Sequence, residues 1–187
     1  MSGDELGLVT AALERAGIAH MLTGSFAAAW YGAARATLDF DLVIDASAEQ
    51  LRRFVTSFSP AEHYVSLDAA LQALAHQSQF NVIALESGWK VDLIIRKARP
   101  FSRMEFDRRI QVEIGGKTHW IVSPEDLVIA KLEWAHRGGS ARQIEDVARL
   151  LTVRGDELDA AYLAHWIAEL GLDAEWDAAR THASPDR

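Results

Sequence analysis

The hydrophobic pattern of the chain changes once, near residue 122, and this change restricts the possible folds more than any other feature. Before it, strand-like runs alternate with helical segments, and two pairs of strands flank the turns Glu86-Ser87-Gly88 and Gly115-Gly116. From Ser123 onward, apolar residues recur only at helical spacing. This layout is typical of the α+β class. We expect a small mixed β-sheet core flanked by helices over residues 1–122, with a C-terminal helical region over 123–187 packed on it.

The individual elements follow from spacing and from helix-capping residues such as Ser47 and Ser123-Pro124. The pattern predicts strands over residues 20–23, 40–44, 80–85, 89–95, 110–114 and 118–122. It predicts helices over residues 4–16, 25–31, 48–57, 67–75, 124–136, 140–151, 156–170 and 173–181.

Composition narrows the class of protein. The 187 residues include no cysteine, which excludes disulfides, thiolate metal sites and cysteine nucleophiles. No apolar run reaches the roughly 18–20 residues of a membrane span, and the first residues lack the pattern of a signal peptide. We therefore expect a cytoplasmic protein without membrane association. The net charge of −8 disfavours nucleic-acid binding over the whole surface.

Three aspartates carry the functional interpretation. Asp39 and Asp41 are two residues apart on an expected strand, so their side chains leave the same face. Asp92 is the one acid in an apolar strand run. Paired carboxylates repel each other, and a divalent cation with a preference for oxygen ligands, Mg²⁺ or Mn²⁺, removes that cost. If the two strands are neighbours, the three carboxylates converge on a metal site suited to phosphoryl or nucleotidyl transfer.

Gly24-Ser25 supplies a second component. Glycine allows the backbone to approach a phosphate, and the N–H groups that begin a helix at Ser25 form an anion site. The alternatives stay open: Gly24-Ser25 as a plain helix cap, Asp39 and Asp41 as surface acids on an edge strand, and Asp92 as a structural acid paired with Lys90 or Arg96.

In this order, Gly24-Ser25, Asp39-Phe40-Asp41 and Asp92 resemble the signature of the DNA polymerase β-like nucleotidyltransferase superfamily. The segment 35–42 and the strand Lys90-Val91-Asp92-Leu93 resemble its minimal and AbiEii-type, type IV toxin-like members. The resemblance implies a nucleotidyltransferase core and adds four site residues. These are Arg35 and Thr37 beside the acids, a helical Lys131, and Asp146 on the next helix.

Each added residue also has a structural alternative. Lys131 either binds nucleotide phosphate or snorkels from an apolar helix face. Asp146 stands four residues after Arg142, which is the spacing of an ordinary helical ion pair. Arg35 and Thr37 either position phosphate or hold their loop. Residues 96–109 carry six cations against two acids, which is either a surface that steers RNA or a solvated charged face.

The leading hypothesis is a metal-dependent nucleotidyltransferase. Asp39 and Asp41 hold Mg²⁺ or Mn²⁺ with the NTP, Asp92 serves as a metal ligand or general base, and Gly24, Ser25 and Lys131 contact the phosphates. By resemblance, the acceptor is RNA such as a tRNA end, a protein hydroxyl or a small molecule, and a toxin–antitoxin or defence role with a cognate antitoxin is implied. The main alternative is a catalytically degenerate fold that acts as a binding partner; a phosphohydrolase is weaker because no His–Asp cluster is visible.

Overall fold

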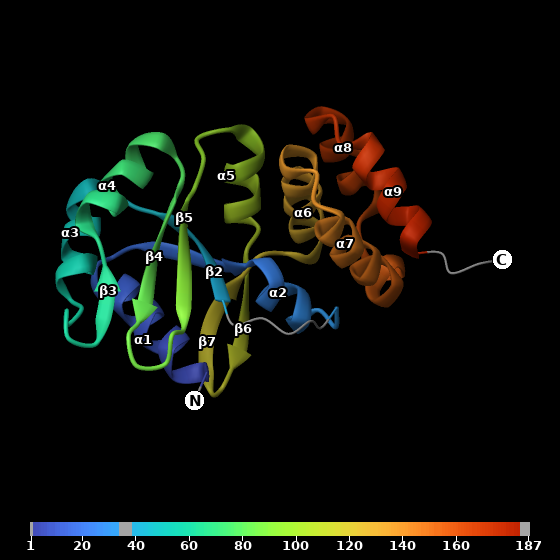
Figure 1. Cartoon of the computed structure of the whole chain (residues 1–187). Coiled ribbons are helices and arrows are strands. Elements are labelled where there is room, and N and C mark those ends of the chain that lie inside the picture. Colours follow the sequence, from blue (N-terminus) through green and yellow to red (C-terminus); the bar gives the residue numbers. More distant parts are fainter. Residues whose placement is uncertain (1, 34–38, 184–187) are drawn as a thin grey trace. The chain divides into compact units, whose positions relative to one another are not determined.

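A computed structural model of the chain describes residues 2–33 and 39–183, with side chains from residue 5 onward (Figure 1). The chain divides into two compact units. The first comprises Met1–Phe26 and Ala36–Ile121, and the second comprises Ala27–Arg35 and Val122–Arg187. The division therefore crosses the helix α2 and falls again between β7 and α6. Arg35 and Thr37 lie outside the described residues.

The first unit is built on a seven-stranded mixed sheet with the order β3-β4-β5-β2-β1-β7-β6. This sheet confirms the expected α+β class. Its strands are β1 Ala19–Thr23, β2 Asp39–Asp45, β3 His63–Val65, β4 Gln79–Ala84, β5 Lys90–Ile95, β6 Ile110–Ile114 and β7 Lys117–Ile121. The two expected hairpins are present as the antiparallel pairs β4·β5 and β6·β7.

One face of this sheet is the core of the first unit. Leu22, Leu42 and Leu93, on three adjacent strands, are fully buried there. The helices that accompany the sheet are α1 Ser2–Arg15, α3 Ala48–Thr56, α4 Leu67–His76 and α5 Pro100–Asp107. Phe54 of α3 meets Phe80 of β4 on the core face, with ring centroids 6.4 Å apart. On the opposite face, the Arg109 guanidinium lies between the rings of Phe106 in α5 and Trp120 in β7.

The second unit is helical and contains the end of α2 (Gly24–Trp30). Its other helices are α6 Pro124–Gly138, α7 Ala141–Arg154, the 3₁₀ turn η1 Gly155–Glu157, α8 Ala160–Leu170 and α9 Asp173–Ala183. Ser123 caps α6 by accepting a hydrogen bond from the backbone N–H of Asp126, as its sequence predicts. Within the described part of the chain, no helix combines the length and apolar character that a membrane crossing needs.

The structure differs from the sequence-based expectations in three places. β3 was not expected because three residues are too few to show an alternating pattern. α5 was not expected because residues 96–109 are dominated by charge, although Pro100 stands at its start. The single helix expected over 156–170 is wrong: η1 ends at Glu157, and Asp159 caps a new helix by accepting hydrogen bonds from the backbone N–H groups of Ala161 and Tyr162.

Besides His63 on β3, two described histidines of the first unit are buried, His20 on β1 and His119 on β7, each 5% exposed. Burial lowers the pKa of both imidazoles, and the neighbouring His20 lowers the pKa of His119 further. For His20, the Ile18 carbonyl at 3.3 Å and the Glu14 carboxylate act in the opposite direction without reversing it. Both residues are therefore neutral in the folded protein at neutral pH.

These histidines predict that the fold weakens in mild acid. An unfolded histidine has a pKa of about 6.5, so the unfolded chain binds more protons than the folded chain just below that pH. The free energy of unfolding should therefore fall as the pH drops from neutral through this value toward the lower folded pKa. Urea denaturation between mildly alkaline and mildly acidic pH measures this slope. The double variant His20→Leu/His119→Leu should flatten it, whereas His76→Gln, at an exposed position, should not; equal slopes in all three proteins would refute the assignment.

Candidate active site

Parallel pairing of β2 with β5 brings the three predicted acids together on one patch of the sheet. In this register Asp41 stands opposite Asp92, and Asp39 stands opposite Lys90. Residues opposite each other on paired strands project to the same face, so all three carboxylates share the face that is not the core. The acids differ in exposure: the Asp39 side chain is 50% exposed, and that of Asp92 is 12% exposed.

Lys90 places an ammonium group among these acids. Its Nζ lies 2.9 Å from Oδ2 of Asp92 and 3.8 Å from Oδ2 of Asp39. The hydrogen bond to Asp92 raises the pKa of Lys90, with further increases from the charges of Asp92, Asp39 and Asp41 that outweigh the effect of burial. The pairing of Asp92 with Lys90 was one of the alternatives left open by the sequence; Arg96 instead contacts Asp45, at 2.8 Å. The patch thus already attracts one cation.

Gly24 lies directly against this patch. Thr23, the last residue of β1, is the cross-strand partner of Asp41, and Gly24 follows it with φ +66° as the first residue of α2. A Cβ built on Gly24 would stand 1.9 Å from Oδ2 of Asp41. This position therefore requires glycine for two reasons: its backbone is left-handed, and the Asp41 carboxylate approaches it closely. Ser25, the next residue, is buried at 9% exposure.

Asn81 is a neighbour of the site that the sequence analysis missed. It is the cross-strand partner of Asp92 on β4, on the side opposite Asp41. The signal was the alternation of β4, where Asn81 is the polar residue between the buried Phe80 and Val82. An amide there adds an uncharged oxygen and an N–H donor to the patch.

The donor set of the patch is suited to a hard divalent cation, because it consists of carboxylate oxygens on two paired strands. Among residues 5–33 and 39–183, no three His, Asp or Glu side chains are gathered into a complete ligand set. Mg²⁺ is commonly held by one or two protein carboxylates, with substrate phosphates and water as its other ligands. The adjacent Asp41 and Asp92, with the glycine backbone beside them, fit that pattern.

The other two predicted residues pair with each other inside the second unit. Lys131 on α6 and Asp146 on α7 are 3% and 1% exposed, and Nζ of Lys131 donates to Oδ2 of Asp146 at 2.8 Å. Lys131 also donates to Oε1 of Gln143 at 3.2 Å, and Arg149 donates to the other oxygen of Asp146 at 3.0 Å. This network joins the two helices.

The basic segment 96–109 is engaged within the first unit at three of its cations. Arg96 lies over the Phe106 ring, Arg99 donates from Nε to the Ser102 hydroxyl at 3.0 Å, and Arg109 stacks between Phe106 and Trp120. These contacts hold three of the six cations of the segment against the first unit.

Comparison with known proteins finds similarity over most of the chain. The model of the family "Nucleotidyl transferase AbiEii toxin, Type IV TA system" matches residues 12–184. No curated protein matches the chain in sequence. Among solved structures, the antibiotic-resistance factor ANT(2'')-Ia is similar with a TM-score of 0.57 at 14% identity, covering 97% of this chain and 98% of that chain.

Two further structures are similar in fold. An antigenic nucleotidyltransferase-like protein from Paracoccidioides brasiliensis has a TM-score of 0.53 at 20% identity, covering 92% of this chain and 89% of that chain. The lincosamide antibiotic adenylyltransferase LnuA, solved with lincomycin bound, has a TM-score of 0.52 at 11% identity, covering 80% of this chain and 96% of that chain.

The position of Gly24 predicts a large effect of a single methyl group. Gly24→Ala introduces both a left-handed alanine and a steric clash with Asp41, whereas Gly88→Ala introduces a left-handed alanine alone, since Gly88 has φ +71° and no atom within 4 Å of its Cβ position. The backbone effect is about 1–2 kcal/mol for either variant, and the clash should add about 1–3 kcal/mol for Gly24→Ala. Urea denaturation measures the difference; equal destabilisation of the two variants would show that Asp41 does not depend on this glycine.

The buried pair of Lys131 and Asp146 predicts that removing one charge lowers the free energy of unfolding more than removing both. Lys131→Met leaves Asp146 buried with only part of its partners, which should cost about 3 kcal/mol of unfolding free energy. Removing both charges in Lys131→Met/Asp146→Leu should be less destabilising than the single change. Arg53→Met, which breaks an ion pair with Glu49 whose two side chains are both exposed, is the control and should cost under about 1 kcal/mol. A double variant that is destabilised as much as Lys131→Met, or more, would contradict a coupled pair.

Proposed function

Since the chain belongs to the AbiEii family of nucleotidyl transferase toxins and is therefore a nucleotidyltransferase, we propose that it transfers a nucleoside monophosphate from an NTP to an acceptor hydroxyl. The acceptor oxygen forms a bond to the α-phosphorus, the bond from that phosphorus to the α–β bridging oxygen breaks, and pyrophosphate leaves. The hydroxyl proton passes to a carboxylate of the site. The single observation that carries this proposal is the register of β2 and β5, which sets Asp41 beside Asp92.

We assign the metal site to Asp39, Asp41 and Asp92, with Mg²⁺ as the ion and Mn²⁺ as its substitute. A divalent cation at these oxygens would neutralise charge on the phosphates during transfer. Support comes from the oxygen-only donors and from the ammonium of Lys90, which lies 2.9 Å from Asp92 and 3.8 Å from Asp39 and shows that the patch stabilises positive charge.

Asp92 is the proposed proton acceptor for the attacking hydroxyl. It is more buried than Asp39, and its Oδ2 accepts from Lys90, which holds the side chain in one orientation. A carboxylate fixed in this way can receive a proton from a hydroxyl within hydrogen-bond distance. Lys90 thus acts as a positioning residue and keeps its own proton, because its pKa is raised.

The triphosphate is assigned to the start of α2 and to the chain that follows it. Gly24 has no side chain, so its backbone is open to a close approach by the β- and γ-phosphates, and the Ser25 hydroxyl and N–H can donate to them. Arg35 and Thr37 are further candidates from the resemblance. Lys131 stays a prediction as a phosphate contact, and that role requires it to exchange Asp146 for phosphate, because the two are paired in this structure.

The acceptor class and the toxin role rest on the family. A family of type IV toxins makes a cellular acceptor and an antitoxin partner the natural proposals. The acceptor is an RNA such as a tRNA, a protein hydroxyl or a small molecule. Incubating the protein with labelled NTP and each class of acceptor distinguishes the three by the product that carries the label.

Nucleotide binding is the first test of the site. We expect calorimetric titration with ATP, GTP, CTP and UTP to show binding of at least one nucleotide that strengthens about tenfold or more with Mg²⁺, since the ion bridges phosphate and carboxylate oxygens. Asp41→Asn should lose most of this metal dependence and the transfer activity. The same change at Asp45, an exposed residue on the same face of β2, should alter neither.

The controls separate loss of function from loss of folding. Asp41→Asn and Asp45→Asn should unfold at similar urea concentrations. If the well-folded wild-type protein binds no nucleotide with or without Mg²⁺, the nucleotidyl-transfer proposal fails and the chain is better described as a degenerate partner protein, in which Lys90 stays paired with Asp92.

A further inference from the structure

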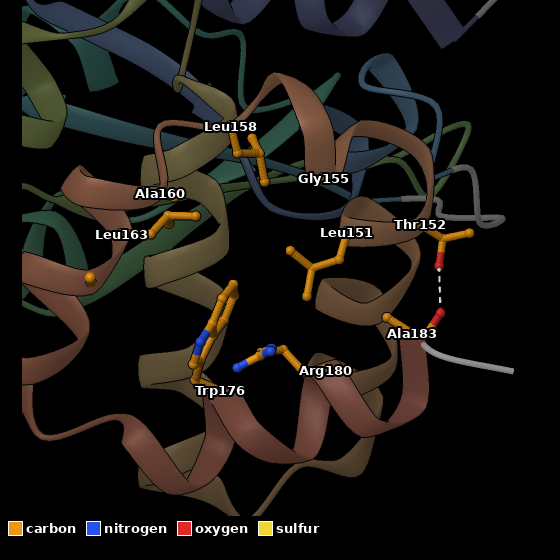
Figure 2. A pocket seen from close by; sticks show the side chains of 10 residues that line it. Leu151, Thr152, Gly155, Leu158, Ala160, Leu163, Trp176, Arg180 and Ala183 are labelled. Carbon is orange, nitrogen blue, oxygen red and sulfur yellow. Dashed lines mark hydrogen bonds between the residues drawn. The ribbon is translucent and has the colours of Figure 1, made fainter. Parts of the chain in front are cut away.

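The second unit contains a pocket that plays no part in the proposed transfer reaction. Its volume is about 530 Å³, within the range of small-molecule sites. It opens between α7, η1, α8 and α9, so every residue that lines it belongs to one unit. Figure 2 shows the ring of Trp176 on one side of the pocket and the side chain of Leu151 across from it. The apolar part of the lining includes Leu151, Leu158, Leu163 and Trp176, and the polar side chains are Thr152 and Arg180.

The charge on the pocket lining is positive. Arg180 is the charged residue among the described residues that line the pocket, and none of those residues is acidic. Figure 2 shows its guanidinium end directed toward the ring of Trp176. Within residues 5–33 and 39–183, no side chain or carbonyl accepts a hydrogen bond from the Arg180 guanidinium or forms an ion pair with it. An apolar pocket with an arginine at its rim is complementary to an organic anion.

The neutral polar group of the pocket is already used. The Thr152 hydroxyl lies 2.9 Å from the Ala148 carbonyl and 3.5 Å from the Ala183 carbonyl; Figure 2 marks the second contact. Its single proton is therefore directed to the backbone, and Arg180 remains the donor that can recognise a ligand. A guanidinium presents parallel N–H groups that match the two oxygens of a carboxylate.

We propose that this pocket binds a small organic anion with a flat, apolar body, such as an aromatic carboxylate. The ring system lies against Trp176 and the leucines, which favour apolar surface, and the carboxylate faces Arg180. The site is independent of the carboxylate patch on β2 and β5, because its lining comes wholly from residues 151–183.

The test uses two probes that differ only in charge, 2-naphthoate and its neutral amide, 2-naphthamide. Isothermal titration of the full chain should show one site that binds 2-naphthoate at least about tenfold more tightly than 2-naphthamide, since a charge-assisted hydrogen bond distinguishes them. Arg180→Gln should abolish this preference by weakening 2-naphthoate and leaving 2-naphthamide unchanged. Arg52→Gln, which removes the same charge from an exposed position on α3, should keep it.

A second variant tests the location. Ala164 lines the pocket from an exposed position on α8, so Ala164→Phe fills the space with little demand on the core. It should reduce the binding of both probes without lowering the thermal unfolding temperature by more than a few degrees. Equal binding of the two probes by the wild-type protein, an unchanged preference in Arg180→Gln, or unchanged binding in Ala164→Phe would each overturn the proposal.

Discussion

The parallel pairing of β2 with β5 is the constraint on which the first unit and its site depend. The two strands are separated in the chain by α3, β3, α4 and β4, yet they pair over six consecutive residues. The core fixes this register, because Leu42 and Leu93 are fully buried on the face opposite the acids. A slip of one residue would turn a carboxylate into the core and an apolar side chain toward the site. The packing that stabilises the sheet therefore also sets Asp41 beside Asp92.

The local features of this site could be predicted from the sequence, but the pairing of β2 with β5 could not. Two acids at spacing two on a strand must share a face, and a glycine followed by serine after a strand is typical of a helix start, so these features could be predicted. Which strand would lie beside Asp41 depends on contacts between distant residues, which no local pattern encodes. The cross-strand position of Asn81 comes from the β4·β5 hairpin, which the sequence did predict. The approach of Asp41 to Gly24 comes from the antiparallel pairing of β1 with β2, which local patterns did not show.

In the second unit, too, local patterns predicted the helices but missed features that depend on particular side-chain contacts. Helical periodicity located its helices, but the break before α8 depends on a side-chain cap by Asp159, which competes with continuation of the helix. The buried contact of Lys131 with Asp146 joins residues from two helices, so their separate sequence contexts gave no sign of it. A lysine at 3% exposure is held by its partner carboxylate as well as by its position, since a buried ammonium without a counter-charge is costly.

Charge balance explains why a site built from three acids is compatible with a stable sheet. Asp39, Asp41 and Asp92 contribute a formal charge of −3 and Lys90 contributes +1, so these four described side chains sum to −2. That residual charge equals the charge that one divalent cation would neutralise, and a second cation would need the phosphates of a nucleotide as its counter-charge. Lys90 thus lowers the repulsion among the acids while leaving these side chains with net negative charge. Within residues 39–183, this ammonium is thus a counter-charge that reduces the repulsion among the acids and still leaves room for a cation.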